Sequence, residues 1–347
     1  MNKAELENNF TELSGLLSRR MTPEGYWTGR LSSSALGVAV AVTALSFYDR
    51  ERYANEIEEG VGWLLKNINA DGGYGDTPES PSNISTSLLV YASLNLFAKS
   101  NSKAAKAMDA VAGYLNQNGI NISSGDIANS ILAHYKNDYT FSVPILTMCA
   151  LCGVGGERAF SRIPQLPFEL ALLPRRFYRF LNLSVVSYAV PALIAVGIVI
   201  HRHKTTSRHV RGIREALIPR AMRKLETIMP ESGGFLEAIP LTAFVCLSLI
   251  KSGFGDSEVV QQGIGFLLRS RRPDGSWPID VDLSTWVTTL SVKALGSKIE
   301  DVLSREERRK IARHLLSVQN KSVHPFNGTG PGGWGWTNYS GFVPDGD

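Results

Sequence analysis

One motif returns along the chain and limits the folds open to it. A polar residue, one or two glycines and an aromatic residue precede a short polar loop, a Ser or Thr, and an apolar stretch ending in Ala-Leu or Ser-Leu. Copies span residues 23–45, 70–94, 230–249 and 272–295, and residues 330–347 resemble the first half of another. Internal repeats of this kind are typical of arrays in which each unit buries its apolar face against its neighbours.

Each copy predicts a turn followed by a helix. Asp-Gly and Gly-Gly pairs favour turns, and a Ser or Thr ahead of an apolar stretch can cap a helix. Apolar stretches such as residues 33–45 and 85–97 predict helices that are covered on all sides. Amphipathic segments at 50–68, 257–271 and 304–320 alternate with them, and no strand-like pattern of any length is found. The sequence therefore predicts an all-α fold built as an α/α barrel.

Chain length and cysteine content limit the number of domains and the kinds of cross-link or metal site that the fold can contain. A chain of 347 residues suits one large domain or two, and its net charge of +4 is mild. Three cysteines give no disulfide framework. Cys149 and Cys152 form a C-x-x-C inside an apolar run, with no second such pair and no His pair nearby, so we expect buried core cysteines there and not a metal or redox site.

Two neighbouring segments raise the question of a membrane. The N-terminus has no apolar region of the signal-peptide type. Residues 180–200 are uncharged and long enough to span a bilayer, but Pro191 and several polar residues interrupt them. A membrane span, a buried helix pair and a surface that dips into the membrane remain open. Three prolines in 161–180 predict a loop there, since they do not fit one helix.

A basic run follows at residues 201–224, where Glu215 is the single acidic residue. A solvated outer helix explains such a run, and contact with anionic lipid headgroups is the alternative. Nucleic acid is not expected as a partner, because aromatic residues are not interleaved with these charges.

Three segments resemble the squalene–hopene cyclase and oxidosqualene cyclase family, the class II terpene cyclases with repeats of the QW type. They are "STWVTTLSVKALG" at 284–296, "PGGWGWTNYSGFVPDGD" at 331–347, and "IPQLPFELALLPRRFYRFLNLSVVSYAVPALI" at 163–194. The resemblance covers the chain from about Gly25 onward and implies two α/α barrels of the α6–α6 toroid type, one inserted in the other. We then expect residues 1–35 to begin the second barrel, 36–270 to form the inserted barrel with a membrane-facing stretch at about 161–200, and 271–347 to be the first part of the catalytic barrel.

The resemblance also implies an activity. Asp345 and Asp347 match the start of the family's D-x-D-D motif, whose aspartate protonates a terminal alkene or epoxide of a linear isoprenoid. Trp286 and Trp336 match positions that line the site and stabilise carbocations. Clustered aspartates can keep one carboxylic acid neutral and able to donate a proton, and aromatic faces stabilise a cation without trapping it. The implied enzyme is an intramolecular transferase or isomerase without metal or cofactor, placed peripherally on the cytoplasmic face of the cell membrane as a monotopic protein.

Some features depart from the family pattern. The D-x-D-D motif would occupy 345–348, Val287 stands where many cyclases have Asp, and "SSSALGVAV" stands where glutamates are usual. We therefore expect an N-terminal fragment of a divergent member, inactive by itself. A non-catalytic isoprenoid-binding barrel and a barrel like the protein prenyltransferase β subunit remain alternatives, although the latter needs an Asp, Cys and His zinc set and no cysteine follows Cys246.

Other acidic and aromatic residues have simpler readings. Asp280 and Asp282 imitate a D-x-D, but we expect them to cap a helix or to lie in a solvated loop. The aromatic residues one or two positions after the turn glycines are expected to be structural; these are Trp27, Tyr74, Phe235, Trp277 and Trp334.

Overall fold

The described chain is all-helical. The structure, a computed structural model, describes residues 2–29, 31–122, 127–136, 138–156, 158–173, 190–323 and 330–337. Within these ranges there is no β-strand, only an isolated bridge between Ser33 and Pro278. The protein has the all-α fold of an α/α toroid, as predicted.

Two compact units make up the chain, and each is described by itself. The larger unit is Leu31–Ile279, and the smaller unit joins Met1–Arg30 to Asp280–Asp347. The domain roles assigned above to 1–35, 36–270 and 271–347 stay predictions.

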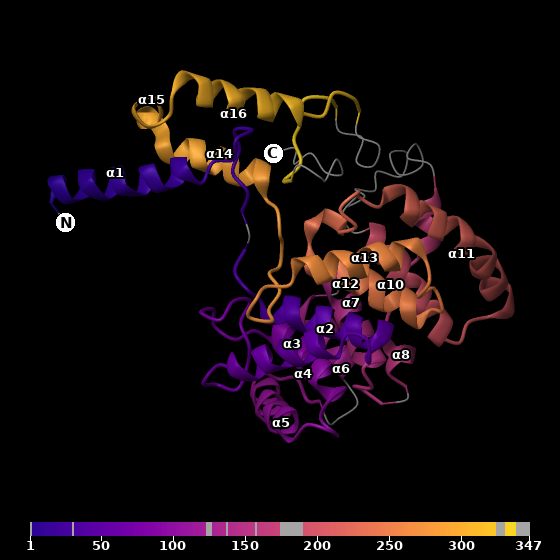
Figure 1. Cartoon of the computed structure of the whole chain (residues 1–347). Coiled ribbons are helices and arrows are strands. Elements are labelled where there is room, and N and C mark those ends of the chain that lie inside the picture. The colour runs from indigo at the N-terminus through magenta and orange to yellow at the C-terminus, as the bar shows by residue number, and fades with distance from the viewer. Residues whose placement is uncertain are drawn as a thin grey trace. The chain divides into compact units, whose positions relative to one another are not determined.

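The larger unit is a closed ring of inner helices. Each inner helix packs against the next one along the chain, and the last packs back against the first (Figure 1). The ring consists of α2 (Ala35–Asp49), α4 (Ile84–Asn95), α7 (Tyr139–Leu151), α10 (Val190–His203) and α12 (Ile239–Lys251).

Outer helices cover this ring. α3 packs against α2, α5 against α4, α6 and α8 against α7, α11 against α10, and α13 against α12. Their bounds are α3 (Ala54–Lys66), α5 (Ser102–Gln117), α6 (Ile127–His134), α8 (Ala159–Arg162), α11 (Arg208–Ile228) and α13 (Glu258–Ser270). Two short 3-10 helices, η1 (Phe168–Leu172) and η3 (Phe235–Glu237), lie between α8 and α10 and between α11 and α12.

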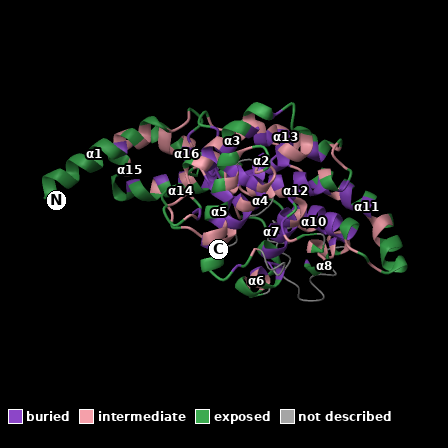
Figure 2. Cartoon of the chain, turned by 90° about the horizontal axis from the view of Figure 1, so that it is seen from below, coloured by how far each residue is buried: buried purple, intermediate pink, exposed green. Residues whose placement is uncertain are grey.

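Burial follows the sequence pattern. In α2 every residue from Gly37 to Leu45 is buried, because an inner helix meets other helices on all sides. The outer helices α3 and α13 bury one stripe and expose the other, as Figure 2 shows. The free energy of the fold therefore comes mainly from apolar burial around the inner ring.

Two turn aromatics of the larger unit are hydrogen-bonded through their side chains to the helix before them. The Tyr74 hydroxyl donates to the Leu64 carbonyl at 2.9 Å, and Trp277 Nε1–H donates to the Leu267 carbonyl at 2.7 Å. In both cases the acceptor lies ten residues earlier, in the last turn of an outer helix, where carbonyls have no i+4 partner within the helix. The repeat aromatics thus bond the end of one helix to the turn that follows it.

The Ser or Thr of the motif mostly serves a different purpose from the one predicted. Ser34 does cap α2, but Asn83 caps α4. Ser87 and Thr242, already inside α4 and α12, accept the backbone N–H of Tyr74 and Phe235, each at 2.9 Å. The helix-capping prediction is wrong for these two copies, because the hydroxyl holds the turn against its own helix.

The smaller unit contains the same kind of hydrogen bond between a turn aromatic and the helix before it. It contains α1 (Lys3–Arg19), α14 (Ser284–Leu295), η4 (Gly296–Lys298), α15 (Ile299–Val302) and α16 (Arg305–Ser317). Trp27 donates its indole N–H to the Leu17 carbonyl at 2.8 Å, and Trp334 donates to the Leu315 carbonyl at 2.6 Å. The buried core of this unit is Trp27, Leu295, Leu303 and Ile311.

The remaining predictions have mixed outcomes. All three cysteines are buried and free, as expected, and the described residues hold no group of three ligands suited to a metal. The proline-rich segment is broken into α8 and η1 up to residue 173, so it is not one helix. Residues 180–189 lie outside the described residues. In the described part of the chain, no helix has both the length and the apolar character to cross a bilayer.

Candidate aromatic site at the start of α14

The first turn of α14 is held by a distant segment. The Trp336 carbonyl accepts the backbone N–H of Thr285 at 3.2 Å and that of Trp286 at 3.4 Å. The first N–H groups of a helix have no partner within it, so these bonds satisfy two of them. The contact fixes residues 330–337 against α14 and brings together the two tryptophans singled out in the sequence.

The two indoles form a small aromatic wall. The ring centroids of Trp286 and Trp336 are 6.2 Å apart and the planes are tilted by 46°. Trp286 is 50% exposed and Trp336 is 40% exposed. Leu290, one turn further along α14, is also 50% exposed and shares the face of Trp286. We call Trp286, Leu290 and Trp336 the aromatic face.

An exposed aromatic face of this kind suits an apolar or cationic ligand. Soluble proteins seldom leave large aromatic rings open to water without a partner. The π face of Trp attracts cations more strongly than that of Phe or Tyr. The face offers both an apolar contact area and electron density for a positive charge.

Two carboxyl groups precede α14. Asp282 is buried, and its Oδ1 accepts the Ser284 N–H at 2.7 Å. It therefore pairs the first N–H of α14, but the N-cap residue is Leu283, so Asp282 is not the cap itself. The alternative of a solvated loop is wrong for Asp282. Burial raises the pKa of Asp282, against the lowering effect of its bonds to Ser284. Sequence reasoning expected Asp280 to cap a helix or to lie in a solvated loop and did not predict that burial raises its pKa to about 6. Its position between Ile279 and Val281 was the available signal.

The predicted acid residues Asp345 and Asp347 lie outside the described residues. Their role as proton donors stays a prediction. The described structure ends at Thr337, a buried residue that directly follows Trp336.

Comparison with known proteins gives a family for the first part of the chain. Residues 11–134 match the family model described as the squalene-hopene cyclase N-terminal domain. The matched range ends before α14, so the aromatic face lies outside it.

Other comparisons add little. No curated protein matches the sequence. A solved structure described as a protein from Actinoplanes shares 18% identity, with 76% of this chain and 81% of that chain covered, at a TM-score of 0.29. A TM-score this low leaves the fold to be judged from the helices themselves.

Proposed function

We propose, because residues 11–134 match the squalene-hopene cyclase N-terminal domain, that the chain is a class II terpene cyclase-like protein that serves the protonation-initiated cyclisation of a linear isoprenoid. The family implies an isoprenoid substrate. The observation that carries the rest of the proposal is the pairing of two half-exposed indoles on one face, 6.2 Å apart.

The aromatic face suits the chemistry of such a reaction. Protonation of an alkene places a carbocation on a flexible apolar chain, and each ring closure moves the charge. A carboxylate in its path would trap the cation or remove a proton from it. Indole faces stabilise the charge without forming a bond, so Trp286 and Trp336 are assigned this role.

Asp345 and Asp347 are assigned the acid role. A proton-donating carboxyl must stay neutral, and a second carboxyl close to it raises the pKa of the first. Asp345 and Asp347 follow Trp336 by nine and eleven positions. Chain length therefore limits their Cα atoms to at most roughly 32 and 40 Å from that of Trp336. The substrate is insoluble in water, which favours a peripheral, monotopic position on the cytoplasmic face of the cell membrane.

Ligand binding tests the aromatic face on this chain. A tertiary amine with a polyprenyl tail carries a positive charge where the carbocation would be. We expect it to quench tryptophan fluorescence saturably, with at least a tenfold loss of affinity in Trp286→Leu and Trp336→Leu. The matched control is Leu316→Ala, an exposed apolar residue on α16, which should leave affinity unchanged. Equal losses in all three variants would contradict a specific site.

Turnover tests the acid role. The protein as its gene encodes it is incubated with squalene and with shorter polyprenes, and cyclised hydrocarbons are sought by gas chromatography–mass spectrometry. Asp347→Asn should abolish the product while binding of the amine persists. An unchanged product would refute the acid role. Binding without any turnover would favour the non-catalytic isoprenoid-binding barrel.

A further inference from the structure

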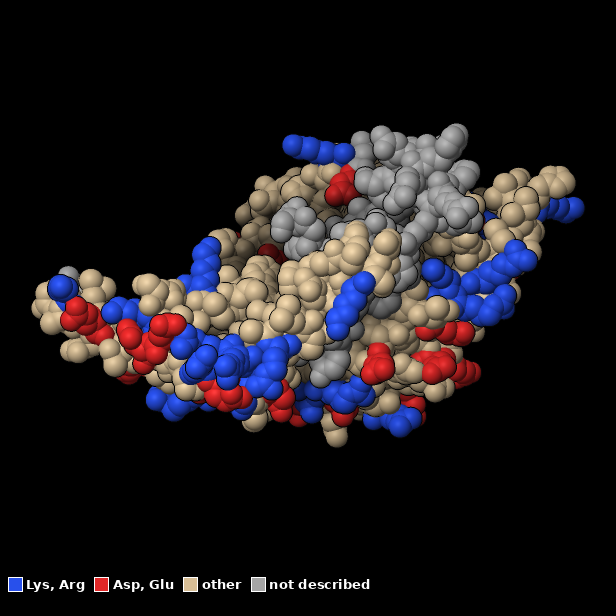
Figure 3. Space-filling model, turned by 90° about the horizontal axis from the view of Figure 1, so that it is seen from above, with Lys and Arg blue, Asp and Glu red and all other residues tan. Residues whose placement is uncertain are grey.

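Helix α11 carries an unusual share of the positive charge. It contains six Lys or Arg residues against Glu215 and Glu226, an excess of four. The whole chain has a net charge of +4, so its other residues are balanced. Lys and Arg side chains gather over α11 on the face seen in Figure 3. An outer helix with this excess presents a positive potential to its surroundings.

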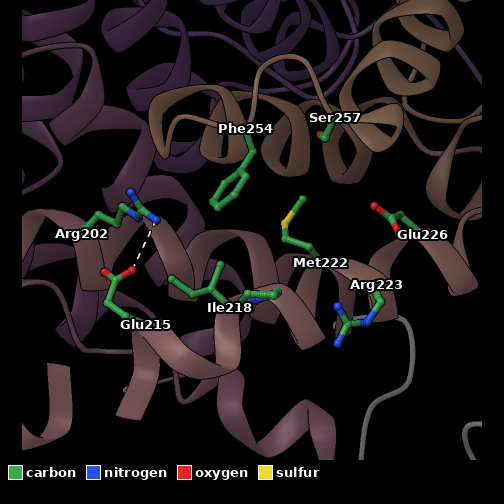
Figure 4. A pocket seen from close by; sticks show the side chains of 9 residues that line it. Arg202, Glu215, Ile218, Met222, Arg223, Glu226, Phe254 and Ser257 are labelled. Atoms are coloured by element: carbon green, nitrogen blue, oxygen red, sulfur yellow. Dashed lines mark hydrogen bonds and ion pairs between the residues drawn. The ribbon is translucent and has the colours of Figure 1, made fainter. Parts of the chain in front are cut away.

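A groove runs along the same helix. α11 packs against α10 and η1 on one side, and on the other it leaves a space of about 530 Å³ beside the connection between α12 and α13. Ile218 and Met222 rise from α11 toward Phe254, which comes down from that connection (Figure 4). This volume lies in the range typical of small-molecule sites, and the groove floor is apolar.

The two ends of the groove differ in charge. At one end Arg202 is neutralised, since its Nη2 lies 3.4 Å from Glu215 Oε2 and its guanidinium lies 5.3 Å from the centre of the Phe254 ring. At the other end Arg223 and Glu226 stand exposed on the rim. The ion pairs formed among the described residues include neither Arg223 nor Glu226.

We propose that this groove binds an amphiphile with one apolar chain and an anionic head of the phosphate or carboxylate type. The chain lies against Ile218, Met222 and Phe254, and the head meets the Arg223 guanidinium. A guanidinium can bind a phosphate or carboxylate through two parallel hydrogen bonds, and the excess charge of α11 favours an anionic head over a zwitterionic one. The site lies wholly within the larger unit and does not depend on the proposed cyclisation.

Calorimetric titration of the whole chain with a single-chain phosphatidylglycerol-type lipid, kept below its micelle concentration, tests this site. We expect saturable binding with one lipid per chain. Inorganic phosphate and an uncharged alkyl glucoside should each bind at least tenfold more weakly, because each offers half of the contacts. Binding of the glucoside as tight as that of the anionic lipid would overturn the anionic assignment.

Paired charge reversals separate a site from a general attraction. Arg223→Glu should lose at least tenfold in affinity. Arg220→Glu is the matched control, since Arg220 is exposed on the same helix but does not line the groove. It should lose less than threefold. Equal losses in the two variants would show diffuse attraction to α11 and overturn the site.

Two further variants test whether the ligand occupies the groove and whether its head group is anionic. Ser257 lines the groove, and its hydroxyl has no hydrogen-bond partner among the described residues, so Ser257→Leu should block the groove and abolish binding while the melting temperature is kept. Glu226→Gln should leave anionic-lipid binding equal or tighter. If instead the protein prefers a phosphatidylcholine-type lipid and Glu226→Gln weakens that binding, the head is zwitterionic and the proposal fails.

Binding of the same variants to vesicles and to dispersed lipid distinguishes a membrane lipid from a soluble amphiphile. Phosphatidylglycerol vesicles that bind the protein in an Arg223-dependent way identify a membrane lipid. Binding of the dispersed lipid without vesicle binding identifies a soluble anionic amphiphile. Either result supports the groove, and absence of saturable binding in both arms refutes it.

Discussion

Two neighbouring tryptophans of one repeat have opposite environments. Trp334 donates its indole N–H to the Leu315 carbonyl and is half-buried, whereas Trp336 is 40% exposed and faces Trp286. Both follow glycines, so their immediate sequence does not distinguish them. The two environments differ because the two residues have different hydrogen-bond partners. The Trp334 ring reaches a carbonyl at the end of α16, whereas the Trp336 backbone carbonyl accepts N–H groups from the first turn of α14.

Asp280 should make stability depend on pH. Its pKa is about 6 in the folded protein, against about 3.9 for an unperturbed aspartate. Between these values the folded protein holds a proton that the unfolded chain releases, so the free energy of unfolding falls as pH rises from about 4 to 6 and then stays level. Urea titrations from pH 4 to 7 should show this fall, and Asp280→Asn should remove that component. A variant with the wild-type profile would contradict the assignment.

At the level of the elements, turns and helices are largely local products of the sequence. Positive φ values occur at Gly72, Gly233 and Gly275 of the repeat turns, where the motif places a glycine. Helix caps were harder to predict, because a hydroxyl near the start of a helix can accept either an N–H of that helix or an N–H of the preceding turn. Ser87 and Thr242 bond the preceding turn, and only the folded turn brings its N–H to them.

Two glycines of the larger unit should respond in opposite ways to the same substitution. Gly275 has φ +83°, and a Cβ there would lie 2.9 Å from the Glu59 backbone, so Gly275→Ala should lower the free energy of unfolding by at least about 1–2 kcal/mol. Gly62 lies within α3 with open space at its Cβ, so Gly62→Ala should raise it by roughly 0.5–1 kcal/mol. Chemical denaturation of the three proteins measures both shifts. Two shifts of the same sign would contradict this account of the repeat turn.

On the scale of the whole molecule, the two units differ in the size of their cores. The larger unit buries most of α2, α4, α10 and α12, whereas the core of the smaller unit is Trp27, Leu295, Leu303 and Ile311 with a few partly buried neighbours. Stability rises with buried apolar area. We therefore expect the smaller unit to unfold first.

Matched substitutions in the two units test this order. Trp27→Phe and Trp277→Phe each remove an indole N–H that pairs a helix-end carbonyl, which should cost about 1–3 kcal/mol in the unit concerned. Scanning calorimetry should show two transitions, with Trp27→Phe lowering the first and Trp277→Phe the second. A single transition that both variants lower equally would show one cooperative unit.

Residue patterns along the chain are enough to predict the all-α class, the alternation of inner and outer helices, the turns and the buried cysteines. These features depend on residue spacing within about thirty positions, where periodicity and turn chemistry act. The folded chain was needed to show that α12 closes the ring on α2, that Trp286 and Trp336 meet while Trp334 bonds a helix end, and that burial raises the pKa of Asp280. Each depends on which distant segment removes water from a group or supplies its hydrogen-bond partner, and burial and pairing are properties of the folded chain.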